Sequence, residues 1–121
     1  MMHNKRGFTL IELLIVVVII GILASIAIPK FANTKDKAYV AAMKSDLRNL
    51  ATYEEQYAAD YNGAYFGGTA TNASPLQGFT PSQNVTIVAT LSGTPVTWQA
   101  NATHTLSGKT CSNTTGVIVC S

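Results

Sequence analysis

A long apolar run near the N-terminus, interrupted by one acidic residue, constrains this chain more than any other feature. From Phe8 to Ile28 the only charged residue is Glu12. At about 1.5 Å of rise per residue, a helix of this length can cross a hydrocarbon core of ~30 Å. A carboxylate inside such a span costs on the order of 2.5–3.5 kcal/mol on insertion scales. We therefore expect Glu12 to have a partner.

The residues ahead of the run set it apart from an ordinary secretory signal. In that signal the small-residue cleavage site follows the apolar core, so the core is lost on cleavage. Here Lys5, Arg6 and Gly7 precede the core, so cleavage after the glycine would leave the helix on the mature protein. Retention suits a helix that first anchors the chain and later packs an assembly. A plain single-pass anchor is the alternative, but a monomeric anchor would gain nothing from Glu12.

The motif GFTLIE at residues 7–12, together with Gly21 and Pro29, resembles the class III signal of bacterial type IV prepilins. The resemblance implies cleavage between Gly7 and Phe8 by a prepilin peptidase, and N-methylation of Phe8 by the same enzyme. It also implies an assembly contact in which Glu12 neutralises the α-amino group of Phe8 in a neighbouring copy. Gly21 and Pro29 both weaken helical hydrogen bonding, so we expect residues 21–29 to unwind when the anchor enters a filament.

The fold that the resemblance implies is α+β, with a long N-terminal helix packed by its second half against a small antiparallel β-sheet. Apolar side chains recur every three or four residues from Val40 to Tyr61, as in an amphipathic helix. The stripe comprises Val40, Met43, Leu47, Leu50, Tyr53, Tyr57 and Tyr61. Asn62-Gly63 supplies a C-terminal stop. We expect a leader (1–7), an apolar half-helix (8–29) and a head (30–121) containing a helix (30–61), a loop (62–83) and a sheet (84–121).

The second half of the head has the composition of strands and turns. Glycine and proline are frequent in residues 62–83, which indicates a loop rather than a regular element. Four later segments are rich in β-branched and apolar residues, and Ser92–Pro95 is a credible turn between the first two. The sequence predicts three or four antiparallel strands within residues 84–92, 95–100, 103–107 and 116–120.

The chain has two cysteines, Cys111 and Cys120. In a membrane-anchored chain whose head faces an oxidising compartment, such a pair indicates a disulfide, although two reduced cysteines remain possible. The pair also resembles the disulfide-bonded C-terminal region of many type IV pilins. Together with the prepilin signal it places the N-terminus in the cytoplasm and the head outside.

All charged residues except Lys109 lie in the first half of the chain. Loss of Lys5 and Arg6 with the leader reduces the eight basic residues to six, which balances the six acidic ones. No basic patch indicates nucleic-acid binding. Residues 30–60 are basic early and acidic late, whereas residues 61–121 hold one charge, Lys109. Either staggered parallel copies pair these helix ends, or the charges form an ordinary solvated face.

No catalytic constellation is evident, and we expect no enzyme activity, no cofactor and no metal site. His104 has no acid or nucleophile near it in the sequence. A second class of protein also resembles this chain at the N-terminus. Major pseudopilins of type II secretion share the signal, but they typically bind calcium through acidic loops. Calcium prefers carboxylate and other oxygen ligands. Residues 61–121 contain no Asp or Glu, which favours a pilin.

The sequence therefore predicts a structural subunit, the major pilin of a type IV pilus, that forms a helical homo-oligomer. Its expected partners are the prepilin peptidase and methyltransferase, the pilus assembly machinery and, before assembly, the inner membrane. The assembled filament would be extracellular. Alternatives are a minor pilin, a type II secretion pseudopilin or, from another class, a membrane-tethered periplasmic sensor or enzyme. Motility, cell adhesion, DNA uptake and conduction are not separated by the sequence.

Overall fold

The computed structural model describes residues 2–121, in which one helix precedes five strands. The elements are α1 (Leu10–Asp60), β1 (Gly68–Thr71), β2 (Val85–Ser92), β3 (Thr97–His104), β4 (Thr110–Thr114) and β5 (Val117–Cys120). The chain divides into two compact units, one ending at Lys35 and the other spanning Asp36–Ser121. Helix α1 contributes to both units.

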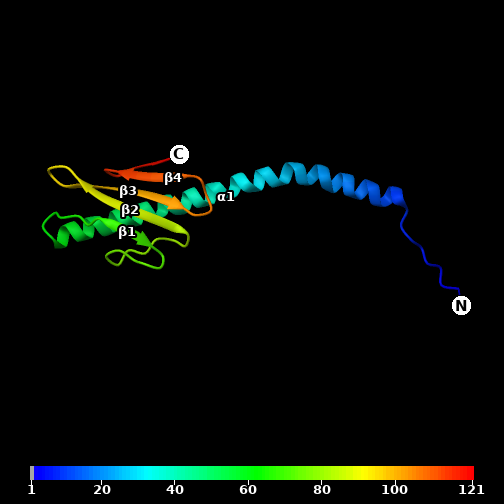
Figure 1. Cartoon of the computed structure of the whole chain (residues 1–121), viewed down its shortest axis with the longest axis horizontal. Helices are drawn as coiled ribbons and strands as arrows, with labels where there is room; N and C mark the ends of the chain where they lie inside the picture. The colour runs from blue at the N-terminus through cyan, green and yellow to red at the C-terminus, as the bar shows by residue number, and fades with distance from the viewer. Residues whose placement is uncertain (1) are drawn as a thin grey trace. The chain divides into compact units, whose positions relative to one another are not determined.

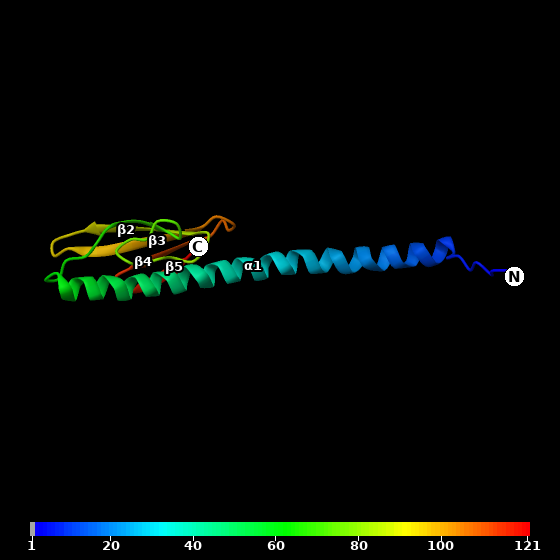
Figure 2. The same ribbon diagram turned by 90° about the horizontal axis from the view of Figure 1, so that it is seen from below.

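In the unit Asp36–Ser121, helix α1 lies along one face of the sheet (Figures 1 and 2). Met43, Leu47 and Leu50 recur at spacings of three or four, and all three are fully buried. This confirms the α+β fold and the amphipathic helix predicted from the sequence. The helix ends at Asp60, and Asn62 and Gly63 follow with positive φ angles of 54° and 80°. The predicted C-terminal stop is therefore present.

The sheet is an antiparallel meander with strand order β1-β2-β3-β4-β5. Its inner face is made by alternate residues, as period-2 side-chain geometry requires. Strand β3 alternates strictly, with Trp98, Ala100, Ala102 and His104 buried and the intervening residues exposed. Several inward positions are alanines, which leave room for the helix side chains. The result is a two-layer core one helix wide.

Three strand predictions need correction. Strand β1 falls inside the predicted loop 62–83, where the short segment GTAT pairs with β2 through backbone hydrogen bonds despite the glycines and prolines around it. Strand β4 was not predicted, because its sequence TCSNT is polar and its inward residues are Cys111 and Asn113. The predicted segments 95–100 and 103–107 are joined in one strand, β3, which is limited to residues 97–104. The turn at Ser92–Pro95 is present between β2 and β3.

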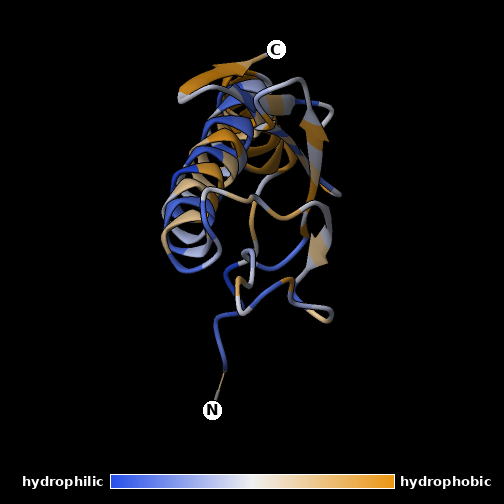
Figure 3. Cartoon of the chain, turned by 90° about the vertical axis from the view of Figure 1, so that its left-hand side faces the viewer, coloured by the Kyte–Doolittle hydropathy of each residue, from blue (hydrophilic) through white to orange (hydrophobic). Residues whose placement is uncertain are grey.

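Cys111 and Cys120 are register partners on the adjacent strands β4 and β5, and a disulfide joins them. The predicted disulfide is therefore present. Strand β5 is the edge of the sheet, and Ile118 and Cys120 pack against the core while Val117 and Val119 are more than half exposed. Its apolar character is visible beside the C-terminus in Figure 3. The disulfide fixes this short edge strand to its neighbour.

Two buried carboxylates on α1 hold the connection between helix and sheet in place. Asp46 accepts hydrogen bonds from the Ser82 amide and hydroxyl, both at 2.9 Å. Glu54 is fully buried, and its Oε2 accepts a hydrogen bond of 3.1 Å from the Phe66 amide. The other oxygen, Oε1, has no hydrogen-bond partner among residues 2–121. Glu54 thus links α1 to the segment that leads from the helix to β1.

Glu54 also corrects the predicted apolar stripe. The apolar spacing predicts that Tyr53 follows Leu50 on the buried face, but Tyr53 is 38% exposed and packs edge-on against Phe79. The helical repeat carries the buried face from Leu50 to position 54, four residues on. A polar residue at a core position is difficult to recognise from periodicity alone, because apolar patterning assigns acids to the solvent face.

Burial has a titration consequence for Glu54. Desolvation raises the pKa of its carboxyl group from the ordinary value of 4.5 to about 7, against the opposing effect of the Phe66 hydrogen bond. The folded state then holds a proton that the unfolded state releases. Stability is therefore highest below about pH 4.5 for this group, falls as the pH rises toward about 7, and is flat above that value.

We predict that Glu54→Gln removes this pH dependence. The rise in the pKa of Glu54 from 4.5 to about 7 corresponds to a loss of about 3 kcal/mol in the unfolding free energy of the unaltered chain as the pH rises through this range. The amide cannot ionise, so the variant should be nearly flat over that range. Denaturant unfolding of the detergent-solubilised full chain, followed by fluorescence of the single tryptophan, Trp98, measures the effect. Glu55→Gln, the same change at the exposed neighbouring position, is the matched control and should retain most of the fall. Equal pH profiles for all three proteins would contradict the assignment.

Candidate functional site: the N-terminal processing and assembly segment

The bond between Gly7 and Phe8 lies in an exposed, non-helical segment directly ahead of α1. Residues 2–9 have no regular secondary structure, and α1 begins at Leu10. The Phe8 side chain is 93% exposed. A backbone bond in this position can be bound by an enzyme without loss of helical hydrogen bonds. The geometry suits the predicted cleavage position.

Glu12 and Thr9 form a reciprocal pair of hydrogen bonds at the start of the helix. The Thr9 amide donates to Glu12 Oε2 at 2.8 Å, and the Glu12 amide donates to Thr9 Oγ1 at 3.3 Å. Thr9 occupies the N-cap position and Glu12 the third helical position. This arrangement is a capping box, in which two otherwise unpaired amides at a helix N-terminus are satisfied. It stabilises the first turn of α1, whose N-cap residue, Thr9, lies two residues after Gly7.

The capping box corrects one argument from the sequence. We expected a carboxylate at position 12 to have no use in a single copy, but Glu12 stabilises the helix start within its own chain. The pattern Thr-x-x-Glu at residues 9–12 is the sequence signal that identifies the motif. Only Oε2 is engaged, and Oε1 makes no hydrogen bond within residues 2–121. The carboxylate therefore retains a free acceptor for a donor from outside the chain.

The apolar residues that follow are uncovered on every side. In the part of the chain that the structure describes, α1 is the one helix long and apolar enough to cross a membrane, and none of that apolar stretch is buried. Large side chains from Leu10 to Ile28 are at least half exposed, for example Val16 at 51% and Leu23 at 62%. Apolar area of this extent must be covered by lipid or by protein.

Gly21 and Pro29 lie inside the continuous helix α1. Proline has no amide hydrogen, so the Ser25 carbonyl four residues earlier loses its usual helical donor. The Ser25 hydroxyl donates back to the Ile22 carbonyl at 2.7 Å. A Cβ atom added at Gly21 would contact nothing within 4 Å, so packing in a single copy does not explain the glycine. Unwinding of residues 21–29 in a filament remains a prediction.

His104 has a structural environment. It is buried, and its ring stacks on Tyr39 with 4.1 Å between centroids. Its Nδ1 accepts a 3.1 Å hydrogen bond from the Leu106 amide. Among residues 2–121, no three His, Cys, Asp or Glu side chains are grouped so that they could hold a metal ion.

Comparison with known proteins agrees with the geometry of the N-terminal segment. Residues 2–28 match the family model described as "Prokaryotic N-terminal methylation motif". The chain is 41% identical over 90 residues to a type IV major fimbrial protein, FimA, of Dichelobacter nodosus, covering 71% of this chain and 56% of that protein. It is 48% identical over 54 residues to the type IV major pilin PilA of Myxococcus xanthus, covering 45% and 24%. The chain is therefore similar to type IV pilins over part of its length.

The chain is also 44% identical over 63 residues to the type II secretion system core protein G of Pseudomonas aeruginosa, covering 52% of this chain and 44% of that protein. The chain spans less than half the length of the core G proteins that it matches. No solved structure is significantly similar to the chain.

We predict that Thr9→Ala weakens the first turn of α1 in this chain. Loss of an N-cap hydroxyl typically costs about 1 kcal/mol, which is about a fivefold loss of protection for the amides that it caps. Amide hydrogen exchange of Glu12 in the micelle-bound full chain measures this directly. Thr9→Ser keeps the hydroxyl and should exchange like the unaltered chain. Equal exchange in the Ala and Ser variants would show that the capping box contributes nothing.

Proposed function

We propose that this chain is the structural subunit, and specifically the major pilin, of a type IV pilus. The observation that carries the proposal is the uncovered apolar half of α1 with Glu12 at its start. A helix that is apolar all round needs a non-aqueous environment. In the proposal that environment is the inner membrane before assembly and neighbouring copies of the same helix afterwards.

Processing supplies the assembly contact in this proposal. A prepilin peptidase removes residues 1–7, and the new terminus at Phe8 is N-methylated. The exposed, non-helical position of Gly7 and Phe8 supports this step. The α-amino group then pairs with Glu12 of a neighbouring copy, through the oxygen that the capping box leaves free. Two groups that are each costly to bury become one charge-assisted hydrogen-bonded pair.

The proposed localisation follows from the same helix. The N-terminus is cytoplasmic before assembly, the apolar half-helix (8–29) spans the inner membrane, and the head (30–121) lies outside. The pilus assembly machinery then moves the processed subunit from the membrane into an extracellular filament. Gly21 and Pro29 would let residues 21–29 unwind during that transfer. The head has no evident catalytic constellation, which supports a structural rather than an enzymatic role.

A type II secretion pseudopilin is the second candidate, because the relatives include core G proteins as well as major pilins. Residues 61–121 contain no Asp or Glu. A head of this composition offers no carboxylate ligand from its loops for calcium, the ion that the pseudopilin resemblance leads one to expect. This composition favours the pilus.

Glu12→Gln tests the proposal, because it separates the charge of Glu12 from its capping role. Glutamine at the third helical position can still accept from the Thr9 amide, so α1 should begin at the same residue. Without the negative charge, the Phe8 ammonium of a neighbour would be buried unpaired, at a cost of several kcal/mol. We expect the variant to be cleaved and to accumulate in the membrane, with at least a tenfold loss of filaments in the sheared fraction.

Thr9→Ala is the matched control, since it weakens the capping box and leaves the charge in place. It should be cleaved and should still form filaments. Gly7→Arg should block cleavage and leave a full-length protein in the membrane. Normal filaments from the Glu12→Gln variant would contradict the proposed role of the charge, and filaments built from uncleaved Gly7→Arg chains would contradict the proposed order of events.

A further inference from the structure

The two ends of the head carry complementary features. The turns β2–β3 and β4–β5 lie at one end of the sheet, and the β3–β4 loop lies at the other. The last turns of α1 also lie at the first end. At the second end the Tyr39 ring, near the beginning of this unit, stacks on His104. The ends are about 25 Å apart, from the eight residues of β3 at ~3.3 Å each.

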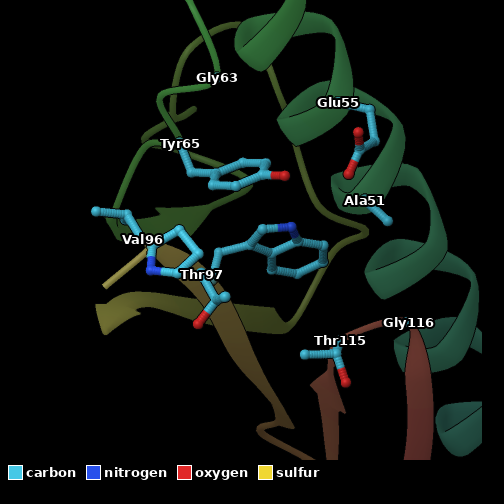
Figure 4. A pocket seen from close by; sticks show the side chains of 10 residues that line it. Ala51, Glu55, Gly63, Tyr65, Val96, Thr97, Thr115 and Gly116 are labelled. Atoms are coloured by element: carbon cyan, nitrogen blue, oxygen red, sulfur yellow. The ribbon is translucent and has the colours of Figure 1, made fainter. Parts of the chain in front are cut away.

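A cavity of about 540 Å³ opens at the first end, between the last turns of α1 and the two strand turns (Figure 4). Its walls are mainly aromatic and apolar, with Tyr65, Pro95, Val96 and Trp98 among them. Glu55 is the only charged residue in the lining. In Figure 4 the Glu55 carboxylate and the Tyr65 hydroxyl point toward one another across the cavity. An occupant of complementary chemistry would be largely apolar and carry a positive charge.

The β3–β4 loop presents that combination at the opposite end. Leu106 is 63% exposed, and Lys109 is the only charged residue in 61–121. The loop is held rigid by its own hydrogen bonds: the Leu106 amide donates to His104 Nδ1, and the Lys109 amide donates to Ser107 Oγ at 3.2 Å. The Ser107 hydroxyl in turn donates to Asp36 on α1 at 3.3 Å. A preorganised loop loses little entropy on docking.

We propose that the β3–β4 loop of one copy docks in the cavity of the next copy, with Leu106 against the aromatic wall and Lys109 paired with Glu55. The occupant is a second copy of this chain, because the complementary charge is on the same molecule. The inference deepens the proposed pilus function and rests on it. An interface between two different patches is heterologous, and such interfaces repeated without closure generate open helical filaments.

The charges of α1 agree with this arrangement. Moving a parallel copy by the length of the head brings Lys37 of that copy to the level of Glu55, since 18 residues of helix span about 27 Å. Lys37 and Lys109 lie at the same end of the unit as Asp36, and Glu55 and Asp60 lie toward the other. The order of charges opposes the helix dipole within one copy. It is favourable between copies stacked head to tail.

Cysteine cross-linking in filaments tests the docking directly. Val96 and Leu106 are exposed, at 48% and 63%, so cysteine at either position should not disturb the core. In sheared filaments of the full chain, Val96→Cys/Leu106→Cys should give a ladder of dimers, trimers and longer species on oxidation, because each copy links to two others. Either single variant can give dimers at most. Val88→Cys/Leu106→Cys, with a valine 40% exposed on the outer face of the sheet, is the matched control and should give no ladder.

A charge exchange tests the pairing of Glu55 with Lys109. Glu55→Lys in the cross-linking background should reduce ladder yield about tenfold, as like charges meet at the interface. Adding Lys109→Glu should restore it. Filaments that form without a ladder would overturn the docking and leave the pilus function intact. Absence of this chain from any sheared filament, together with absence of a ladder in membranes, would overturn both. A ladder that Glu55→Lys leaves unchanged would overturn the assigned ion pair.

Discussion

The uncovered apolar surface of the first half of α1 is the constraint on which the rest of this structure depends. From Leu10 to Ile28 the large side chains have no protein cover within their own chain. Water cannot accommodate that surface, so the chain needs lipid or other copies around it. The lack of cover, the proposed cleavage position ahead of the helix and the single acid inside it are parts of one arrangement. A helix that is apolar on every side is stable in lipid or among other copies, but not in water.

Glu12 has a place in both environments. In a single copy its Oε2 caps the helix through the Thr9 amide, so the carboxylate is not left unpaired before assembly. In the proposed filament, its remaining acceptor would bind the terminus of a neighbouring copy. A residue that served only one of these states would be exposed as an isolated charge in the other, which is costly in an apolar medium. The proposed dual use would give a physical reason for an acid at this depth.

The periodicity of apolar residues predicts much of the fold, but not the buried polar contacts that connect α1 to the rest of the head. The spacing of Met43, Leu47 and Leu50 gives the packed face of α1, and the β-branched run at 85–92 gives β2. Strands β1 and β4 were missed because pairing with a neighbouring strand, rather than apolar alternation, holds them in the sheet. Buried Glu54 was missed because its partner, Phe66, lies twelve residues later in the chain. The N-terminal motif is recognisable in the sequence, but the sequence reasoning did not assign Thr9 its role as the N-cap.

Mass spectrometry of fibres sheared from producing cells tests the central claim most directly. The account predicts that the dominant protein in the fibre fraction begins with N-methylated Phe8. This result would establish cleavage after Gly7, retention of the apolar helix and incorporation into an abundant surface filament. Processed chain confined to membranes and absent from the fibres would contradict the major-pilin assignment. A full-length chain with an intact Gly7–Phe8 bond would contradict the account at its starting point.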